Sequence, residues 1–390
     1  MFICRRILQI GLPCCVLLAG CATSRPVPPS VAPAAASSAA APAPVRIGPG
    51  EPPPEPSATE SAPGRLRPEV EAYARDLAAG SGLPLAQVQA SLSGAYYNPT
   101  VARLIAPAPP GRKVWRSWQT YRSRFVEPKR IRWGTEFWQA NAGLLDQAAQ
   151  RYGVPASVIA AIIGVETLYG RNMGNFRVMD ALATLAFDYP QPARPERIEL
   201  FRNQLGDFIT LALRGKLDLE ARGSYAGAIG MPQFMPGSIL RYAVDGDGDG
   251  HIDLANSQAD AIMSVGNFLV EHGWRRGVPV FAPVTLPADP SAMATGGLAP
   301  TQDWPRLQAA GARPAPGAAP RAWQALPLGV VDLVEEARGT AQYRVGTPNF
   351  YALTQYNRSY FYATAVSDLA DALAASVDRA GALQARGPGR

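Results

Sequence analysis

The sequence has few of the residues that form disulfides or bind transition metals. All four cysteines lie within the first 21 residues, so the body of the chain has no disulfide and no cysteine metal site. Only two histidines are present, His251 and His272. A histidine zinc site and a Ser-His-Asp triad each need histidines placed beside specific partners, and two isolated histidines argue against both.

The chain also lacks any block of basic residues. Lysine and arginine together number 37 against 31 acidic residues, for a net charge of +6, and the excess is spread along the sequence. This pattern indicates a solvated surface and argues against nucleic acid as a partner. With 390 residues and 47% hydrophobic content, the chain is long enough for one large domain or two smaller ones with real cores.

The first 21 residues have the features of an export signal. Arg5 and Arg6 precede a short apolar run, Ile7 to Leu18, which is too short to span a bilayer comfortably. The run ends in Leu-Ala-Gly-Cys21, which resembles the cleavage box of bacterial lipoproteins. The resemblance implies lipidation of Cys21 and a periplasmic chain anchored to the outer membrane of a Gram-negative bacterium. An ordinary cleaved signal with an incidental cysteine is the alternative.

Residues 22–64 are rich in Pro, Ala and Ser and contain almost no large apolar residue. Such a segment cannot bury a core, so we predict a disordered tether with polyproline-like stiffness. At ~3 Å per residue the tether reaches on the order of 100 Å when extended. A folded domain could therefore work well away from the membrane surface.

The most apolar helical stretch of the chain ends at a single carboxylate. Gly153 predicts the end of one helix and Pro155 the first turn of the next. Every residue from Val158 to Val165 is apolar or Gly, so this helix should be buried. Glu166 follows, where desolvation and the negative end of the helix dipole both favour the protonated form. Such a carboxyl can act as a general acid; a surface Glu capping the next turn is the alternative.

Three further segments carry side chains that suit either a binding groove or ordinary packing. Residues 224–238 are rich in small residues, which allow close backbone approach, and Gln233 is their only amide. Tyr121 stands among tryptophans and arginines, a combination that also stacks on sugars. Tyr356 and Asn357 precede an apolar helix, where Asn357 is by default a cap or turn residue. Each segment stays open between a structural role and a place in a cleft.

One loop has the spacing of a calcium site. It carries carboxylates at positions 1, 3 and 5, with Gly at 6 and an apolar residue at 8, which matches the start of an EF-hand loop: Asp245, Asp247, Asp249, Gly250, Ile252. Position 12 is Asn256 where the standard loop has Glu. Asp260 either closes a longer loop or forms a capping box with Ser257. We predict a calcium site, with a cluster of Asp-Gly turns as the alternative.

The remaining sequence predicts a mainly α (α+β) protein. Apolar residues recur at helical spacing in 69–79, 84–93, 131–152, 178–187, 198–214, 258–272 and 360–377. Short β-like runs occur only in 278–286 and 325–345. A small β-containing portion therefore accompanies a helical core.

Taken together, these motifs resemble the membrane-bound lytic murein transglycosylase B family over roughly Trp115 to Val366. The resemblance rests on Gly-Val-Glu166-Thr, the segment 224–236, the Asp-rich loop and Tyr356-Asn357, in this order and spacing. It implies a lysozyme-like helical core with an EF-hand-like calcium loop. It also implies cleavage of the MurNAc-β-1,4-GlcNAc bond of peptidoglycan with formation of 1,6-anhydroMurNAc ends. Glycan strands are the implied partner, and other cell-wall enzymes are further candidates.

The same resemblance suggests a division of the folded chain and a set of site residues. The parts are an N-terminal helical part (65–130), a catalytic core with the calcium loop (131–285) and a C-terminal part that completes the cleft (286–390). Glu166 is similar to the family's catalytic acid, and the implied substrate contacts are Ser224, Gln233, Tyr356, Asn357, Tyr362 and Tyr121. The implied calcium ligands are Asp245, Asp247, Asp249, the His251 carbonyl and Asp260. Gln191-Pro192 stands where many members have two arginines that face the peptide stem.

A single acid suffices if the substrate supplies the nucleophile. Most glycosidases use two carboxylates. The other candidates are Asp180, in a predicted helix, and Asp188, at the end of that helix, and neither lies in a motif that presents it to a cleft. We therefore expect the C6 hydroxyl of the muramic sugar to close the anhydro ring. A muramidase that uses water and a non-catalytic peptidoglycan-binding lipoprotein are the two alternatives.

Overall fold

The protein is described by a computed structural model that covers residues 59–107, 111, 115–317 and 322–385. The predicted signal peptide, Cys21 and the tether up to residue 58 lie outside these residues. Helices dominate the described chain, and the strands form only small antiparallel sheets. The mainly α prediction with a small β portion is therefore confirmed.

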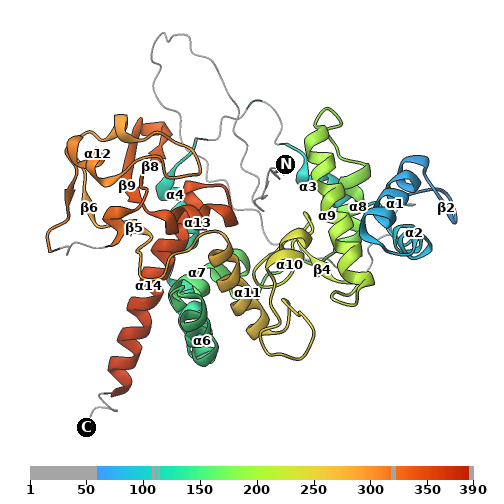
Figure 1. Cartoon of the computed structure of the whole chain (residues 1–390), viewed down its shortest axis with the longest axis horizontal. Helices are drawn as coiled ribbons and strands as arrows, with labels where there is room; N and C mark the ends of the chain where they lie inside the picture. The colour runs from blue at the N-terminus through green and yellow to red at the C-terminus, as the bar shows by residue number, and fades with distance from the viewer. Residues whose placement is uncertain (1–58, 108–110, 112–114, 318–321, 386–390) are drawn as a thin grey trace, which may run out of the picture.

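One end of the molecule is a group of helices from two separate stretches of the chain. They lie at the right of Figure 1: α1 (Pro68–Ser81), α2 (Leu85–Ser93), α3 (Pro99–Ile105), α8 (Val178–Phe187) and α9 (Pro195–Leu213). The two long helices α8 and α9 pack on each other, α3 packs on α8, and α2 packs on α9. Short strands β3 (Phe176–Arg177) and β4 (Arg222–Gly223) pair at the base of this group.

The centre of the molecule is built around the apolar helix α7 (Ala156–Thr167), which packs against four other helices. They are α5 (Pro128–Ala140), α6 (Ala142–Tyr152), α11 (Gln258–Glu271) and the long α14 (Tyr360–Ala385). Every residue from Val158 to Val165 is buried, as its composition predicts. Since α7 is covered on all sides, the chain end that leaves it is fixed by its neighbours.

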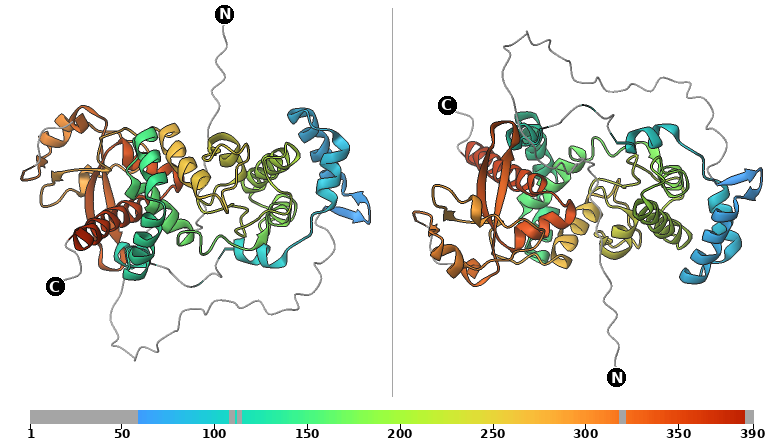
Figure 2. Two further views of the ribbon diagram at one scale, coloured as in Figure 1. Left: turned by 90° about the horizontal axis from the view of Figure 1, so that it is seen from below. Right: turned by 90° about the horizontal axis from the view of Figure 1, so that it is seen from above.

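The other end carries the three-stranded sheet and one of the two-stranded sheets, as Figure 2 shows from two sides. The elements are β5 (Phe281–Ala282), β6 (Val284–Thr285), α12 (Trp304–Ala309), β7 (Arg313–Pro314), β8 (Gly329–Glu335) and β9 (Thr340–Gly346). Strand β9 pairs with both β5 and β8, and Gly329 lies opposite Gly346. This part has its own small core, in which the rings of Trp304 and Trp323 meet edge to face at 5.1 Å.

The remaining helices connect these parts. They are α4 (Trp118–Phe125), α10 (Pro236–Tyr242) and α13 (Pro348–Tyr356). Helices α4 and α13 both pack on α14, whereas α10 packs on α9 and α11. The segment predicted as one N-terminal helical part, 65–130, thus contributes α1 to α3 at one end of the molecule and α4 next to α14 and β8.

The structure differs from the sequence prediction at two points. The folded chain includes Thr59 and does not begin at Arg65, because β1 (Glu60–Ala62) pairs with β2 (Arg65–Leu66) and the buried Thr59 hydroxyl donates to the Leu92 carbonyl at 2.9 Å. The helical pattern of 131–152 belongs to two helices, α5 and α6. Asn141 separates them, and its side chain donates to the Phe137 carbonyl at 2.8 Å, which ends α5.

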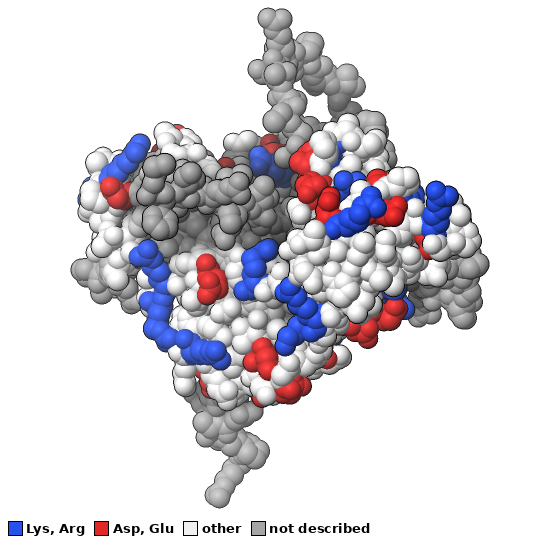
Figure 3. Space-filling view, turned by 45° about the vertical axis from the view of Figure 1, so that its right-hand side comes forward, with Lys and Arg blue, Asp and Glu red and all other residues white. Residues whose placement is uncertain are grey.

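The surface carries both signs of charge, as the face in Figure 3 shows. This agrees with the interpretation of the basic excess as a solvated surface. Among the described residues, no single helix is long and apolar enough to cross a membrane, and the one bent pair that passes by length and composition, α6 with α7, turns by 114°.

Candidate active site

Glu166 lies in the last turn of α7 and meets a tyrosine from the far end of the chain. It is half-buried, whereas the helix residues before it are buried. The Tyr362 hydroxyl, in the first turn of α14, donates to Glu166 Oε1 at 2.6 Å. The contact joins residues 196 positions apart in sequence, and it exists because α7 and α14 pack side by side.

The environment of Glu166 holds its carboxyl partly protonated near neutral pH. Burial raises the pKa of this group, and the hydrogen bond from Tyr362 lowers it, which together give a pKa of about 7. Burial disfavours the charged form, while a donor to the carboxylate favours it. A carboxyl with this pKa can both give and take a proton at neutral pH.

Two aromatic side chains that the sequence singled out lie near this acid, and a third lies near Tyr362. The rings of Tyr356 and Tyr362 stack at 6.1 Å with an interplanar angle of 14°. The Tyr356 hydroxyl donates to the Pro232 carbonyl. Tyr121 of α4 packs on Phe361 at 5.6 Å, beside Tyr362 in the chain. Burial, with Glu166 as the next cause, raises the pKa of both Tyr356 and Tyr362 well above the usual value, so both hydroxyls stay protonated.

The predicted amides differ in what they contact. Gln233, which has a positive φ of 51°, donates through Nε2 to the carbonyls of Gly230 at 2.9 Å and Met173 at 3.2 Å. It thereby joins the loop after α7 to the loop before α10. Asn357 is buried at the end of α13, and its side-chain amide has no hydrogen-bond partner among the described residues.

Ser224 shapes the loop that bears Gln233. Its hydroxyl oxygen accepts hydrogen bonds from the Ala228 amide at 3.0 Å and the Ala226 amide at 3.3 Å. These bonds form a tight turn of small residues. The predicted role of Ser224, which is to orient Glu166, stays a prediction.

The two other carboxylates that the sequence offered as partners for Glu166 are held in ion pairs. Asp180 pairs with Arg177 at 2.8 Å and also accepts from the Tyr96 amide at 2.9 Å. Asp188 pairs with Arg67 at 3.1 Å. Among the described residues, no second carboxyl influences the pKa of Glu166. The geometry therefore presents one acid and no carboxylate partner for it.

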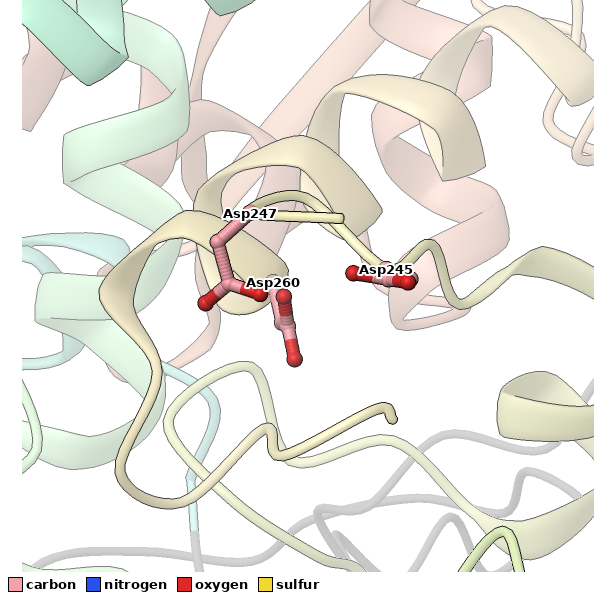
Figure 4. Close-up of side chains that lie close together, drawn as sticks. All are labelled: Asp245, Asp247 and Asp260. Atoms are coloured by element: carbon pink, nitrogen blue, oxygen red, sulfur yellow. The ribbon is translucent and has the colours of Figure 1, made fainter. Parts of the chain in front are cut away.

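The Asp-rich loop brings three carboxylates together. Asp245, Asp247 and Asp260 place one oxygen each within 4.8 Å of one another. Figure 4 shows the three side chains. Asp260 is only 1% exposed, and its two oxygens accept from the amides of Gly246 at 2.8 Å and Asp253 at 2.6 Å. Three carboxylates this close repel one another unless a cation lies between them, and carboxylate oxygens are the ligands that calcium prefers. The residues present therefore fit a calcium ion.

Asp249, which was also predicted as a calcium ligand, is not part of this carboxylate cluster. Asp249 is exposed, and its Oδ1 accepts from the His251 amide at 2.8 Å. Asp260 has both of the roles that the sequence left open. It joins the cluster, and its amide also donates to the Ser257 hydroxyl at 3.2 Å, as in the first half of a capping box.

Sequence reasoning missed three residues that surround the end of α7. The buried Thr167 hydroxyl donates to the Met231 carbonyl at 2.8 Å and so ties Glu166 to the Gln233 loop. The buried Arg130 donates to the Gly164 carbonyl. Tyr169 fills a space between Gly134 and Gly164. The only sequence signal for this packing is the presence of two glycines inside helical segments.

The chain is similar to known proteins over most of its length. The family described as "Transglycosylase SLT domain" matches residues 65–371. The membrane-bound lytic murein transglycosylase B of Escherichia coli K12 is 42% identical over 265 residues, which are 66% of this chain and 68% of that protein.

Two solved structures are similar over most of the chain. The catenated lytic transglycosylase SltB1 of Pseudomonas aeruginosa has a TM-score of 0.70 at 37% identity, covering 80% of this chain and 98% of that one. The Escherichia coli lytic transglycosylase Slt35 in complex with calcium has a TM-score of 0.68 at 35% identity, covering 82% and 97%.

Fold and site thus define a lysozyme-like enzyme of the class that cleaves glycan chains. The family match and the identity to its relatives go further: the chain belongs to the lytic murein transglycosylase family. It is a peptidoglycan-cleaving lyase with the lysozyme-like helical fold that the sequence motifs imply.

Proposed function

We propose that the enzyme cleaves the MurNAc-β-1,4-GlcNAc bond and forms 1,6-anhydroMurNAc ends, with Glu166 as its single catalytic acid and base. The observation that carries the proposal is the half-buried carboxyl of Glu166, with a pKa of about 7 and a hydrogen bond from Tyr362. A group that must first give a proton and then take one works best when its pKa lies near the ambient pH.

The proposed reaction has two proton transfers through one side chain. Glu166 first protonates the glycosidic oxygen, and the GlcNAc leaves with that proton. The N-acetyl carbonyl of the muramic sugar stabilises the positive anomeric carbon. Glu166, now a carboxylate, removes the proton from the C6 hydroxyl, whose oxygen bonds to the anomeric carbon. An intramolecular hydroxyl has a large proximity advantage over water, so the reaction needs no second carboxylate.

The remaining predicted residues would bind the sugars around this acid. Asn357 supports the proposal because its amide has no partner among the described residues, and it can pair with an acetamido group. The amide oxygen of Gln233 likewise accepts no hydrogen bond from another described residue. Tyr121 offers a ring for stacking, Tyr356 supports Tyr362 through their stacked rings, and Ser224 would orient Glu166. Peptide-stem recognition cannot use an arginine pair at Gln191-Pro192.

Mass spectrometry of muropeptides released from purified sacculi tests the function. We expect the wild-type enzyme to release anhydro products and Glu166→Gln to release none while still sedimenting with sacculi. Glu199→Gln is the matched control, because Glu199 is exposed on α9 and should leave turnover unchanged. Products heavier by one water would indicate a hydrolytic muramidase, and an inactive wild type that binds sacculi would indicate a non-catalytic wall protein.

We also propose a structural calcium ion at Asp245, Asp247 and Asp260. The close carboxylate oxygens of these residues support it, as does the similarity to a relative solved with calcium. An ion bound there would hold the loop between α10 and α11. Chelation should therefore lower the melting temperature without changing the product.

Finally, we propose that Cys21 is lipidated and anchors the enzyme to the outer membrane on the periplasmic side. The Leu-Ala-Gly-Cys21 box and the similarity to a membrane-bound relative support this location. Cys21→Ser should move the protein from the membrane fraction to the soluble periplasmic fraction, because several acyl chains are needed for stable anchoring. A serine variant that stays in the membrane fraction would contradict the anchor.

A further inference from the structure

The chain takes an unusual backbone path directly after Glu166. Leu168 and Tyr169 have φ values of 53° and 61°, in the left-handed region that non-glycine residues rarely adopt. Their amides close the end of α7 by donating to the carbonyls of Gly164 at 3.2 Å and Ile163 at 3.3 Å. This conformation is unfavourable for residues with a side chain, so the surrounding structure must hold the turn in place.

The ring of Tyr169 is held between α5 and α7. It is buried and lies 5.5 Å from the ring of Phe137. A Cβ added at Gly134 of α5 would lie 2.2 Å from the Tyr169 hydroxyl oxygen, and one added at Gly164 of α7 would lie 2.5 Å from it. Only glycine fits at either position while the ring stays, so the two glycines form a notch for this side chain.

A buried cation fixes the same helix end from the other side. The Arg130 guanidinium donates to the carbonyl of Gly164 and, at 3.2 Å, to the carbonyl of Arg124. It also lies 5.1 Å from the ring centre of Phe125. Both carbonyls belong to the last turns of their helices, α7 and α4, where the helix dipole is negative. Among the described residues no carboxylate lies at ion-pair distance from Arg130, and the charge of the more distant Glu127 favours its protonated form, so the two helix ends and Glu127 together stabilise its charge.

We propose that Arg130 and Tyr169 are positioning residues for Glu166: they fix the last turn of α7 so that its carboxyl stays aligned with Tyr362 and with the scissile bond. Among the described residues, the hydrogen bond of the Glu166 side chain is with Tyr362 and not with Arg130 or Tyr169; both act through the backbone of residues 164–169. The inference rests on the proposed role of Glu166 as the acid. Since a misplacement of ~1 Å can cost about 100-fold in rate, a device that fixes this turn would matter for kcat more than for KM.

Steady-state kinetics on soluble glycan fragments of Gly134→Ala tests the notch. We expect kcat to fall at least ~10-fold with KM within about two-fold, because the new methyl group displaces the ring and with it the turn. The matched control is Gly143→Ala in α6, where an added Cβ meets nothing within 4 Å. Both changes replace a helix glycine by alanine, so the control carries the same gain in helix propensity and should keep wild-type kcat.

Rescue distinguishes positioning from a general loss of packing. Tyr169→Phe removes a buried hydroxyl that has no hydrogen-bond partner among the described residues. In the Gly134→Ala background it should recover part of the lost kcat, because it removes the atom that the new Cβ meets most closely. Arg130→Lys, which keeps the charge but loses the planar fork, should lower kcat and shift the basic limb of the pH–rate profile.

The outcomes separate this proposal from the proposed function. A folded Gly134→Ala and a folded Arg130→Lys with wild-type kcat and pH profile would overturn the positioning role, even if Glu166→Gln is inactive. An active Glu166→Gln would instead overturn the assignment of the acid. If Gly134→Ala does not fold, Arg130→Lys decides the question by the same readouts.

Discussion

At the scale of single residues, the balance of forces on Glu166 sets the pH dependence of turnover. The reaction begins with a protonated carboxyl, so kcat/KM should fall as pH rises through the pKa of about 7. The bond from Tyr362 lowers this pKa, and its removal should raise it. In Tyr362→Phe we therefore expect the basic limb of the pH–rate profile to move to higher pH. A limb that stays in place or moves to lower pH would show that another group controls it.

The same shift has a consequence for stability. The pKa of Glu166 is about 7 in the folded protein against 4.5 for the ordinary group, so the folded state binds the proton more tightly. The contribution of this protonation to the stability of the fold is complete below the ordinary pKa and is lost as pH rises through about 7. At about pH 8 the unfolding free energy of Glu166→Gln should therefore exceed that of the wild type by at most ~3 kcal/mol. The variant should accordingly melt at a higher temperature.

Melting curves at several pH values check this second prediction. The difference between the two proteins should shrink steadily towards about pH 5, where the wild-type carboxyl is protonated in the folded state. Glu199→Gln, on an exposed surface, should follow the wild type throughout. A difference that grows towards low pH would contradict the raised pKa.

Glu166 could be predicted from its neighbours in the chain, whereas the residues that position it could not. An apolar run that ends in one carboxylate is visible in the sequence because burial of a helix depends on the composition of that helix. Arg130 lies 34 positions from the carbonyl that it contacts, and nothing near it in sequence predicts a buried cation. Tyr169 likewise reads as an ordinary loop residue until the two glycines are seen to face it.

At the scale of elements, the Asp-rich loop depends on a residue from the following helix. Asp260 accepts two backbone hydrogen bonds from the loop, from Gly246 and Asp253. Asp260→Ala would leave both amides without this acceptor, at a cost of about 2 kcal/mol in unfolding free energy even without calcium. Asp249→Ala, which loses one exposed local bond, should cost much less.

Thermal melting in chelator and in excess calcium separates the two effects. The loss caused by Asp260→Ala should be visible in chelator, and the further rise that calcium gives to the wild type should be absent in the variant. If Asp260→Ala melts like the wild type in chelator, the hydrogen bonds do not stabilise the loop. If calcium raises both melting temperatures equally, the ion binds elsewhere.

Most helices could be placed from the sequence, and the exceptions have local causes. The spacing of apolar residues placed α8, α9 and α11 to within a few residues. The pattern of 131–152 gave no sign of the break at Asn141, because the same face of both helices stays apolar. Likewise, β1 is too short and too polar to stand out from the Pro/Ala-rich sequence before it.

At the scale of the whole molecule, one buried carboxylate connects elements from both ends of the chain. Asp368 of α14 is only 8% exposed, and it pairs with Arg122 of α4 at 2.5 Å and with Arg344 of β9 at 2.6 Å. Asp368→Asn would leave two arginines without their counter-charge. We expect a loss of about 2 kcal/mol, below the value for a fully buried pair because both arginines are partly exposed.

Denaturant unfolding measures this loss, and Asp378→Asn is its control. Asp378 is exposed on the same helix, so the control changes the same charge without breaking a buried pair. We expect the two variants to differ clearly in the midpoint of unfolding. Equal midpoints would show that α4 and β9 are held to α14 by apolar contacts alone, such as the packing of Trp118 on Phe361.

The sequence by itself determined the helical class, the acid at the end of α7 and three of the aspartates in the loop. Each of these depends on residues within one or two turns of each other, where composition and spacing decide the local structure. Only the tertiary structure decided that Tyr362 binds Glu166, that Asp260 joins the loop, and that Arg130 and Tyr169 fix the turn after the acid. Those contacts depend on how α14, α11 and α5 pack against their neighbours, and that packing arises from the whole buried surface of each helix, which no short stretch of sequence contains.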